Sequence, residues 1–149
     1  MGLYDSFKTS SKLETEGVSL DLGFVKIQVA RAGGQNQKYN AALVAINAKH
    51  GRALTGRLLP ENKVREILYE AYADFIILNW ETNTAPEAEA PVWVQGIENP
   101  DGGELLPFNK ENVLATLRAL PAIFDEIKTT AESITFYRQS LLDDATKNS

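Results

Sequence analysis

Residues 17–30 read Gly-Val-Ser-Leu-Asp-Leu-Gly-Phe-Val-Lys-Ile-Gln-Val-Ala, and they give the clearest indication of secondary structure in the chain. Apolar and polar residues alternate on both sides of Gly23, which is the period-two pattern of a half-buried strand. Gly23 interrupts that alternation and allows two interpretations. With Phe24 it forms a two-residue hairpin turn, or it marks a bulge within one long strand. We favour two strands, and hence a small antiparallel sheet near the N-terminus.

The residues before the first strand, 1–15, are polar and mixed, with little periodicity. We predict a flexible arm that carries one short apolar motif, formed by Leu3, Tyr4 and Phe7. A frayed terminus is the simpler interpretation, because the ends of domains are poorly ordered unless something holds them. The functional interpretation is a hook that binds a neighbouring subunit through Leu3 and Phe7.

Two helices are expected after the strands. The first covers residues 36–50, where Asn36 can cap the first turn and apolar residues recur at helical spacing. The second begins at Pro60, which suits a first helical position, and continues to Trp80. Its apolar stripe consists of Val64, Ile67, Leu68, Ala71, Tyr72, Phe75 and Leu78. Burial of each large side chain contributes about 1.5 to 3 kcal/mol, so this helix is expected at the centre of the core.

Loops and helices alternate in the second half of the chain. Residues 82–91 are rich in Thr, Asn, Ala, Pro and Glu and predict a mobile loop, and residues 92–97 can form a short strand after it. Asn109 is a good capping residue for a helix, and Pro121 should end that helix and open another that continues to Leu141.

The length of 149 residues fits one domain. We predict an α+β fold, mainly helical with a small N-terminal antiparallel β-sheet, as a single domain at residues 16–143, followed by a polar tail at 144–149. The chain has no cysteine, which excludes a disulfide framework. A net charge of −5 disfavours nucleic-acid binding, and no apolar run reaches the ~18 residues of a membrane span. We therefore expect neither nucleic acid nor membrane as a partner.

Residue patterns typical of active sites are missing from the sequence. His50, the single histidine, lies beside Lys49 and Arg52 with no carboxylate close in sequence, so an exposed helix-end residue is the simpler interpretation. Gly33-Gly34 lies between a strand and a helix but lacks the further residues of a phosphate-binding loop. We expect no enzymatic activity, no metal site and no cofactor.

The two tryptophans fit different environments. Trp80 ends the predicted central helix and is expected in the core. Trp93 flanks a loop, and both a core position and an interface position stay open for it, because aromatic residues are enriched in both.

Several segments together resemble the tail assembly chaperone family of long-tailed (siphovirus-type) bacteriophages. The similarity runs from about Val25 to Arg138 and depends on the order and spacing of its pieces. These pieces are residues 25–36, 38–39, 70–73, 78–81, 96–97, 101–103, 106–112 and 117–127, together with Phe136. The chain departs from the family pattern at residues 82–95, which resemble a loop insertion between the Trp-Glu pair and Gly96-Ile97.

This resemblance implies a non-enzymatic role. Family members bind the tape-measure protein, a long helical chain that sets tail length, and keep it soluble until the tail tube polymerises around it. The resemblance therefore implies a homo-oligomer in the cytoplasm of the infected host that is absent from the mature virion. We expect partner contacts from Leu3, Phe7, Trp93, Ile134, Tyr137 and Leu141.

Three alternatives compete with this prediction. A structural tail or connector subunit of the virion has the same composition and differs only in staying with the particle. An enzyme acting on a small ligand is disfavoured by the absence of a partnered histidine and of cysteine. A nucleic-acid regulator is disfavoured by the acidic composition.

Overall fold

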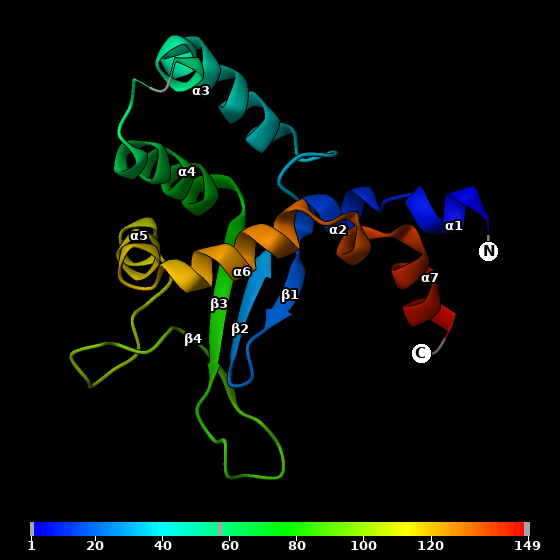
Figure 1. Cartoon of the computed structure of the whole chain (residues 1–149). Helices are drawn as coiled ribbons and strands as arrows, with labels where there is room; N and C mark the ends of the chain where they lie inside the picture. Colours follow the sequence, from blue (N-terminus) through cyan, green and yellow to red (C-terminus); the bar gives the residue numbers. More distant parts are fainter. Residues whose placement is uncertain (1, 57, 148–149) are drawn as a thin grey trace.

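A computed structural model describes residues 2–56 and 58–147. Within these residues the chain is a single α+β domain with a four-stranded antiparallel sheet of order β1-β2-β3-β4 (Figure 1). The strands are β1 (Val18–Asp21), β2 (Val25–Val29), β3 (Ile77–Asn83) and β4 (Trp93–Gln95). The helices are α1 (Leu3–Phe7), α2 (Ser11–Glu16), α3 (Gln37–Thr55), α4 (Glu61–Phe75), α5 (Lys110–Ala119), α6 (Pro121–Glu132), the 3-10 helix η1 (Ile134–Tyr137) and α7 (Gln139–Lys147). The predicted fold class is confirmed.

The first two strands form the hairpin that the alternation predicted. The Leu22 amide donates a hydrogen bond of 2.8 Å to the Val25 carbonyl, so Gly23 and Phe24 are the two turn residues. Gly23 has φ +101°, which glycine adopts more readily than other residues. Two strands and a tight turn are therefore confirmed over one long bulged strand.

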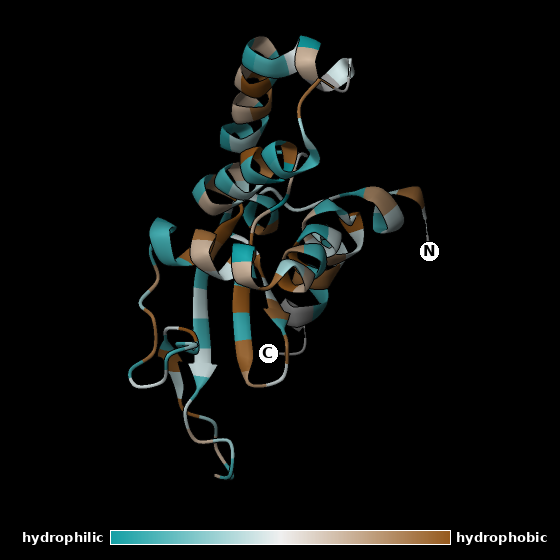
Figure 2. Ribbon diagram, turned by 60° about the vertical axis from the view of Figure 1, so that its left-hand side comes forward, coloured by the Kyte–Doolittle hydropathy of each residue, from teal (hydrophilic) through white to brown (hydrophobic). Residues whose placement is uncertain are grey.

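One face of the sheet carries the core, and α6 crosses over that face (Figure 1). Apolar and polar residues alternate along the strands in Figure 2. Ile27 and Trp80, which are cross-strand partners, are both buried. Above them, Tyr69 and Tyr72 of α4 pack edge-on against Phe124 of α6, with ring centroids 4.8 and 5.0 Å apart. Such edge-to-face contacts add specificity to apolar burial.

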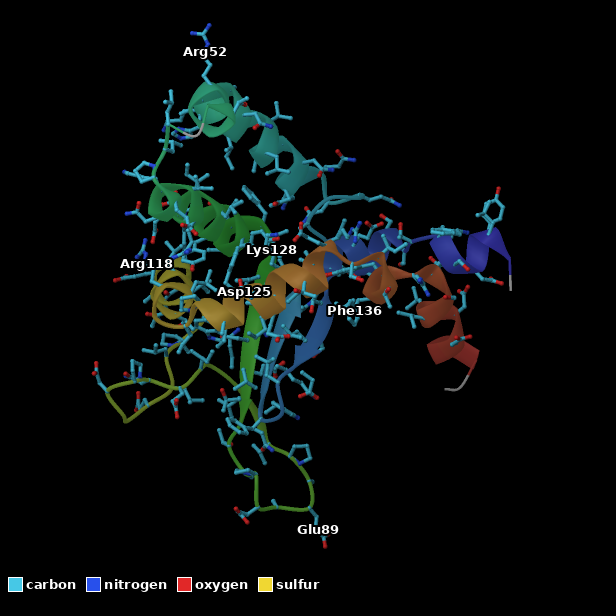
Figure 3. All side chains as sticks on the ribbon, viewed as in Figure 1. Arg52, Glu89, Arg118, Asp125, Lys128 and Phe136 are labelled. Carbon is cyan, nitrogen blue, oxygen red and sulfur yellow. The ribbon has the colours of Figure 1, made fainter. Side chains whose placement is uncertain are left out.

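Polar contacts join the helices at the surface. Arg118 of α5, labelled in Figure 3, donates two hydrogen bonds of 2.8 Å to the Glu66 carboxylate of α4. Lys110 Nζ lies 3.0 Å from a carboxylate oxygen of Asp74, the residue before the last of α4. These contacts link α4 to α5 near both ends of α5.

The central helix is shorter than predicted. α4 ends at Phe75, and β3 begins at Ile77, so Trp80 lies in a strand and the predicted loop at 82–91 starts only after Asn83. The prediction failed because the apolar residues of β3 fall at positions that also continue the helical stripe. Pairing of β3 with β2 then determines the local structure, since tertiary context outweighs weak helical preference.

The predicted helix from Pro121 to Leu141 is interrupted. α6 does begin at Pro121 and α5 is capped by Asn109, as predicted, but α6 ends at Glu132. The Ser133 hydroxyl then accepts a hydrogen bond from the Thr135 amide and starts η1. Tyr137, the last residue of η1, is fully buried after this break.

Helices α1 and α2 lie in the segment where little periodicity indicated no regular element, and the flexibility of this arm stays a prediction. Ser10 caps α2, and its amide donates to the Tyr137 carbonyl at 2.8 Å. The Gln139 amide donates to the Lys8 carbonyl at 2.9 Å, so the segments before α2 and before α7 run side by side. Met1 of the predicted arm and residues 148–149 of the predicted tail lie outside the described residues. Across residues 2–56 and 58–147, no helix combines the length and apolar character needed to cross a membrane.

Candidate partner-binding surfaces

Large apolar side chains are exposed where the two ends of the chain meet. Helices α1 and α7 contact each other at one end of the molecule (Figure 1), and the Ser140 hydroxyl donates to the Asp5 carbonyl at 3.4 Å. We call the exposed apolar residues of these helices, Leu3, Tyr4, Phe7 and Leu141, the terminal surface. Leu3 is 70% exposed, Phe7 63% and Leu141 47%. The chain thus presents several large apolar side chains to solvent on two helices in mutual contact.

Three of the six predicted partner-binding residues lie on this surface. Leu3 and Phe7 lie on α1 and Leu141 lies on α7, and Ile134 lies half-buried in η1, just before α7. Trp93 lies elsewhere, on β4, where the Lys26 Nζ is 4.1 Å from its ring centroid. The structure therefore separates Trp93 from the other predicted residues.

Tyr137 is a correction to the predicted set. Its side chain is 0% exposed, and its hydroxyl donates a hydrogen bond of 2.9 Å to the Val29 carbonyl of β2. It is a core residue here and offers no surface to a partner. The helical spacing that placed it beside Leu141 does not hold, because the helix breaks at Ser133.

A buried ion pair joins helix α2 to the segment that follows β2. Glu14 of α2 is almost fully buried, and one of its carboxylate oxygens lies 3.6 Å from Arg31 Nε. The same oxygen accepts a hydrogen bond from the Gln35 amide, and the Arg31 guanidinium lies 5.8 Å from the Tyr137 ring centroid. Burial raises the pKa of Tyr137 above its ordinary value of 10.0, Arg31 lowers it, and Glu14 raises it.

In the glycine pair between β2 and α3, the second position, Gly34, has no room for a side chain. A Cβ atom at Gly34 would lie 1.7 Å from the Glu14 carboxylate oxygen, and the residue has φ +52°. The space that a phosphate-binding loop would keep free is therefore filled by the protein's own carboxylate. Sequence spacing gave no sign of this contact, because Glu14 and Gly34 are separated by a hairpin.

A second apolar surface lies at the turn end of the sheet. An open groove of about 510 Å³ runs between the β1–β2 turn, the loop after β4 and the junction of α5 with α6. We call it the end groove. Its lining residues are Leu22, Phe24, Val25, Thr82, Ile97, Glu98, Pro100, Leu105, Thr116, Ala119, Leu120 and Ile123. No local sequence pattern predicts this site, since its residues come from four separate segments.

Two large exposed apolar residues of the end groove come from different walls. Phe24, in the hairpin turn, is 64% exposed, and Leu120, between α5 and α6, is 50% exposed. Leu120 is exposed because Pro121 starts a new helix, which directs the chain away from the axis of α5. A leucine preceding a proline in a helical region is the sequence signal that could have indicated this wall.

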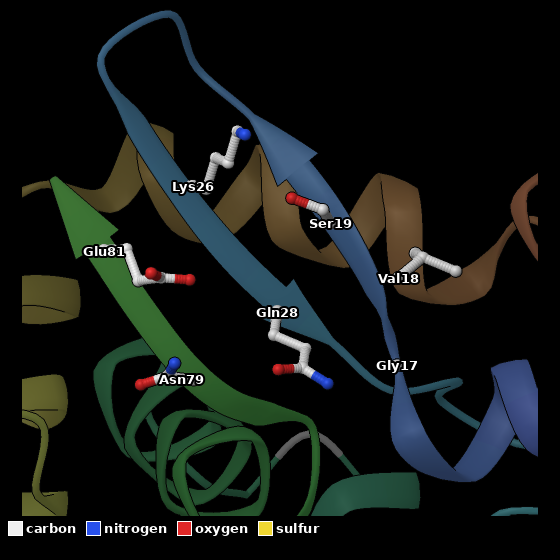
Figure 4. Close-up of a pocket in the computed structure, with 7 residues that line it drawn as sticks. All are labelled: Gly17, Val18, Ser19, Lys26, Gln28, Asn79 and Glu81. Carbon is white, nitrogen blue, oxygen red and sulfur yellow. The ribbon is translucent and has the colours of Figure 1, made fainter. Parts of the chain in front are cut away.

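The outer face of the sheet is polar. A shallow hollow of about 260 Å³ on this face is lined by Gly17, Val18, Ser19, Lys26, Gln28, Asn79 and Glu81 (Figure 4). Lys26 is paired in register with Asp21 on one side and with Glu81 on the other. Alternating charges of this kind stabilise neighbouring strands and keep the face hydrated, which is the ordinary role of such residues.

Groups suited to metal binding are absent from the part of the chain that the structure describes: it holds no cluster of three His, Cys, Asp or Glu side chains. His50 lines a shallow hollow of about 380 Å³ between α3 and α4, together with Glu70 and Asp74. Asp74 is already engaged by Lys110, so the hollow has no free carboxylate pair at that position.

Comparison with known families links the C-terminal part of the chain to bacteriophages. A family model described as YdaY prophage protein matches residues 93–148. The chain is phage-derived. The matched segment contains β4, α5, α6 and α7, and with them one wall of the end groove and part of the terminal surface. No curated protein and no solved structure matches the chain.

Proposed function

We propose that this phage protein is a tail assembly chaperone, which binds the tape-measure protein and keeps it soluble until the tail tube polymerises. The observation that carries the proposal is the exposure of large apolar side chains on ordered elements. Soluble monomers rarely leave large apolar patches uncovered unless a partner binds there. A phage origin and the resemblance of residues 25–138 to the tail assembly chaperone family support the same role.

Release of the client is part of such a role. A long amphipathic helix aggregates when it is free, and a chaperone must cover its apolar stripe yet leave when tube subunits arrive. Many copies that each bind with modest affinity meet both needs, because linked binding events reinforce one another while any single contact exchanges quickly. We assign the terminal surface to contacts between copies of the chain. The resulting homo-oligomer then binds along the client helix with several copies.

The proposed role is binding without chemistry. It needs no cofactor, and it places the protein in the host cytoplasm during assembly and outside the finished particle. The polar hollow on the sheet and the solvated ion pairs of α4 and α5 serve solubility in this proposal.

Co-expression with the tape-measure protein encoded by the same phage tests the proposal. We expect the tape-measure protein to move from the insoluble to the soluble fraction and to co-purify with this chain. If it stays insoluble and the two never associate, the chaperone proposal is wrong. Mass spectrometry of purified particles then distinguishes the alternative, because a structural tail or connector subunit would be found in the virion.

A further inference from the structure

The end groove exists because the sheet extends beyond its helical cover. Val25 is paired in register with Thr82, and Thr82 with Val94, while the Leu22 amide bonds to the Val25 carbonyl. Cross-strand neighbours point to the same face, so these four residues form the last row of the inner face. Helices α5 and α6 cover the earlier rows and meet at Leu120, which lines the groove together with Val25 and Thr82.

An apolar row at the end of a sheet is normally covered by another element. Here the wall residues Phe24 and Leu120 are at least half exposed, and Val94, which ends the row outside the residues that line the groove, is 42% exposed. A small ligand would sit within an enclosed pocket and leave these rim residues in water. A helix laid across the row would contact the rim residues and complete the helical layer.

Negative charge on one wall of the groove favours a helix that carries positive charge. Residues 81–109 contain six acidic residues and no Lys or Arg. Three of the acids, Glu98, Asp101 and Glu104, lie on the loop that forms one wall, where Glu98 lines the groove and all three are exposed. Electrostatic complementarity at an interface rim steers the matching partner and rejects a like-charged one.

We infer that the end groove binds an amphipathic helix whose apolar stripe is flanked by Lys or Arg. The inference rests on the proposed function in one respect, which is that this helix belongs to the tape-measure protein. Apolar side chains of the helix pack on the Val25–Thr82 row between Phe24 and Leu120, and its basic flank faces Glu98 and Glu104. In this helix-in-groove mode of binding, the groove recognises apolar side chains of the helix at positions i, i+3 or i+4 and i+7.

Two pairs of variants test the groove in the full chain. Phe24→Asp with Leu120→Asp places charges on both walls, and Val44→Asp on α3, at a site that is 70% exposed, is the matched apolar control. Glu98→Lys with Glu104→Lys reverses the rim charge, and Asp125→Lys with Glu126→Lys on α6 is the matched charge control (Figure 3). Thermal melts of every variant verify folding, and all substituted side chains are substantially exposed.

The first readout is the amount of tape-measure protein that co-purifies with each variant. We expect a loss of at least about tenfold for both groove variants and amounts close to wild type for both controls. If the wild type binds the tape-measure protein and the groove variants bind it equally well, the groove inference is wrong while the chaperone proposal stands.

A second readout keeps the groove testable when the wild type does not bind the tape-measure protein. Two fluorescent peptides with one leucine stripe, flanked by Lys in the first and by Glu in the second, are titrated by anisotropy. The inference expects the Lys peptide to bind the wild type at least about tenfold more tightly than the Glu peptide, with the preference lost in the rim variant. Equal binding of both peptides, or none, overturns it. Loss of self-association in the groove variants would instead assign the groove to a second copy.

Discussion

Glu14 and Gly34 show how two residues that are distant in sequence depend on each other. The Glu14 carboxylate is buried beside Arg31, and it reaches that position only because Gly34 has no side chain. Removing one member of a buried charge pair leaves the other charge uncompensated, and this costs several kcal/mol in typical cases. The pair therefore makes α2 part of the folded domain.

Substitution of Gly34 tests that dependence. We expect Gly34→Ala to lower the free energy of unfolding by at least about 2 kcal/mol, because the new methyl group meets Glu14 and the residue has a positive φ. Gly102→Ala is the matched control, since Gly102 has φ +82° and nothing within 4 Å of the added Cβ. Urea denaturation measures the free energy of unfolding of both variants. Equal losses of stability in the two variants would show that the clash with Glu14 is relieved at no cost.

Tyr137 gives a prediction in alkaline solution. Burial raises its pKa in the folded chain above the ordinary value of 10.0, so the folded state holds the phenolic proton more tightly than the unfolded state does. Stability from this group is complete below about pH 10 and is lost as pH rises further. We expect the free energy of unfolding to fall less steeply above pH 10 in Tyr137→Phe than in the wild type.

The same variant has a second effect at neutral pH. Tyr137→Phe removes the hydrogen bond to the Val29 carbonyl, and an unsatisfied buried acceptor costs about 1 to 3 kcal/mol. Burial also raises the pKa of Tyr72 and of Tyr39, so some alkaline loss persists in the variant. Identical alkaline slopes in the two proteins would contradict the role assigned to Tyr137.

Among the elements, those with a strong local signal were predictable. The β1–β2 hairpin, the Asn109 cap and the start of α6 at Pro121 follow from alternation, capping and proline chemistry. The end of α4 and the break at Ser133 do not, because long-range contacts decide them. Pairing with β2 fixes β3, and the bond from Tyr137 to Val29 favours the turn before α7.

The candidate surfaces likewise divide into residues that local sequence could indicate and residues that long-range contacts bring together. Leu3, Phe7 and Leu141 were predicted as partner contacts and are all exposed, whereas Tyr137 was misplaced by an assumed continuous helix. The end groove was missed altogether, since it forms only when four separate segments meet.

Helix α7 is the element that joins the two chain ends. Deleting residues 139–149 removes the Gln139 bond to Lys8 and the Ser140 contact with α1. We expect this truncation to weaken self-association at least about tenfold, measured by size-exclusion chromatography with light scattering. The point variant Leu141→Asp, which keeps the helix, should weaken it less. Unchanged assembly after truncation would remove the terminal surface from the proposed interface.

At the scale of the whole molecule, the two apolar surfaces belong to different parts of the fold. The terminal surface is formed by α1 and α7, which lie at one end of the molecule (Figure 1). The end groove lies between the hairpin turn and the α5–α6 junction. No residue belongs to both. In the proposed function, one copy can therefore bind a neighbouring copy and a client helix at the same time, which is the condition for avidity.

This separation predicts that self-association and client binding can be uncoupled. We expect Leu3→Asp with Phe7→Asp to yield monomers that still bind a Lys-flanked helical peptide with the affinity of the wild type. The same variant should bind the full tape-measure protein at least about tenfold more weakly, because each copy then binds alone and avidity is lost. Val44→Asp with Leu58→Asp, at two other exposed apolar sites, is the control and should change neither value. Light scattering and peptide anisotropy measure the two properties separately. A variant that loses peptide binding together with self-association would mean that the groove forms only in the oligomer, and the two surfaces would then act as one site.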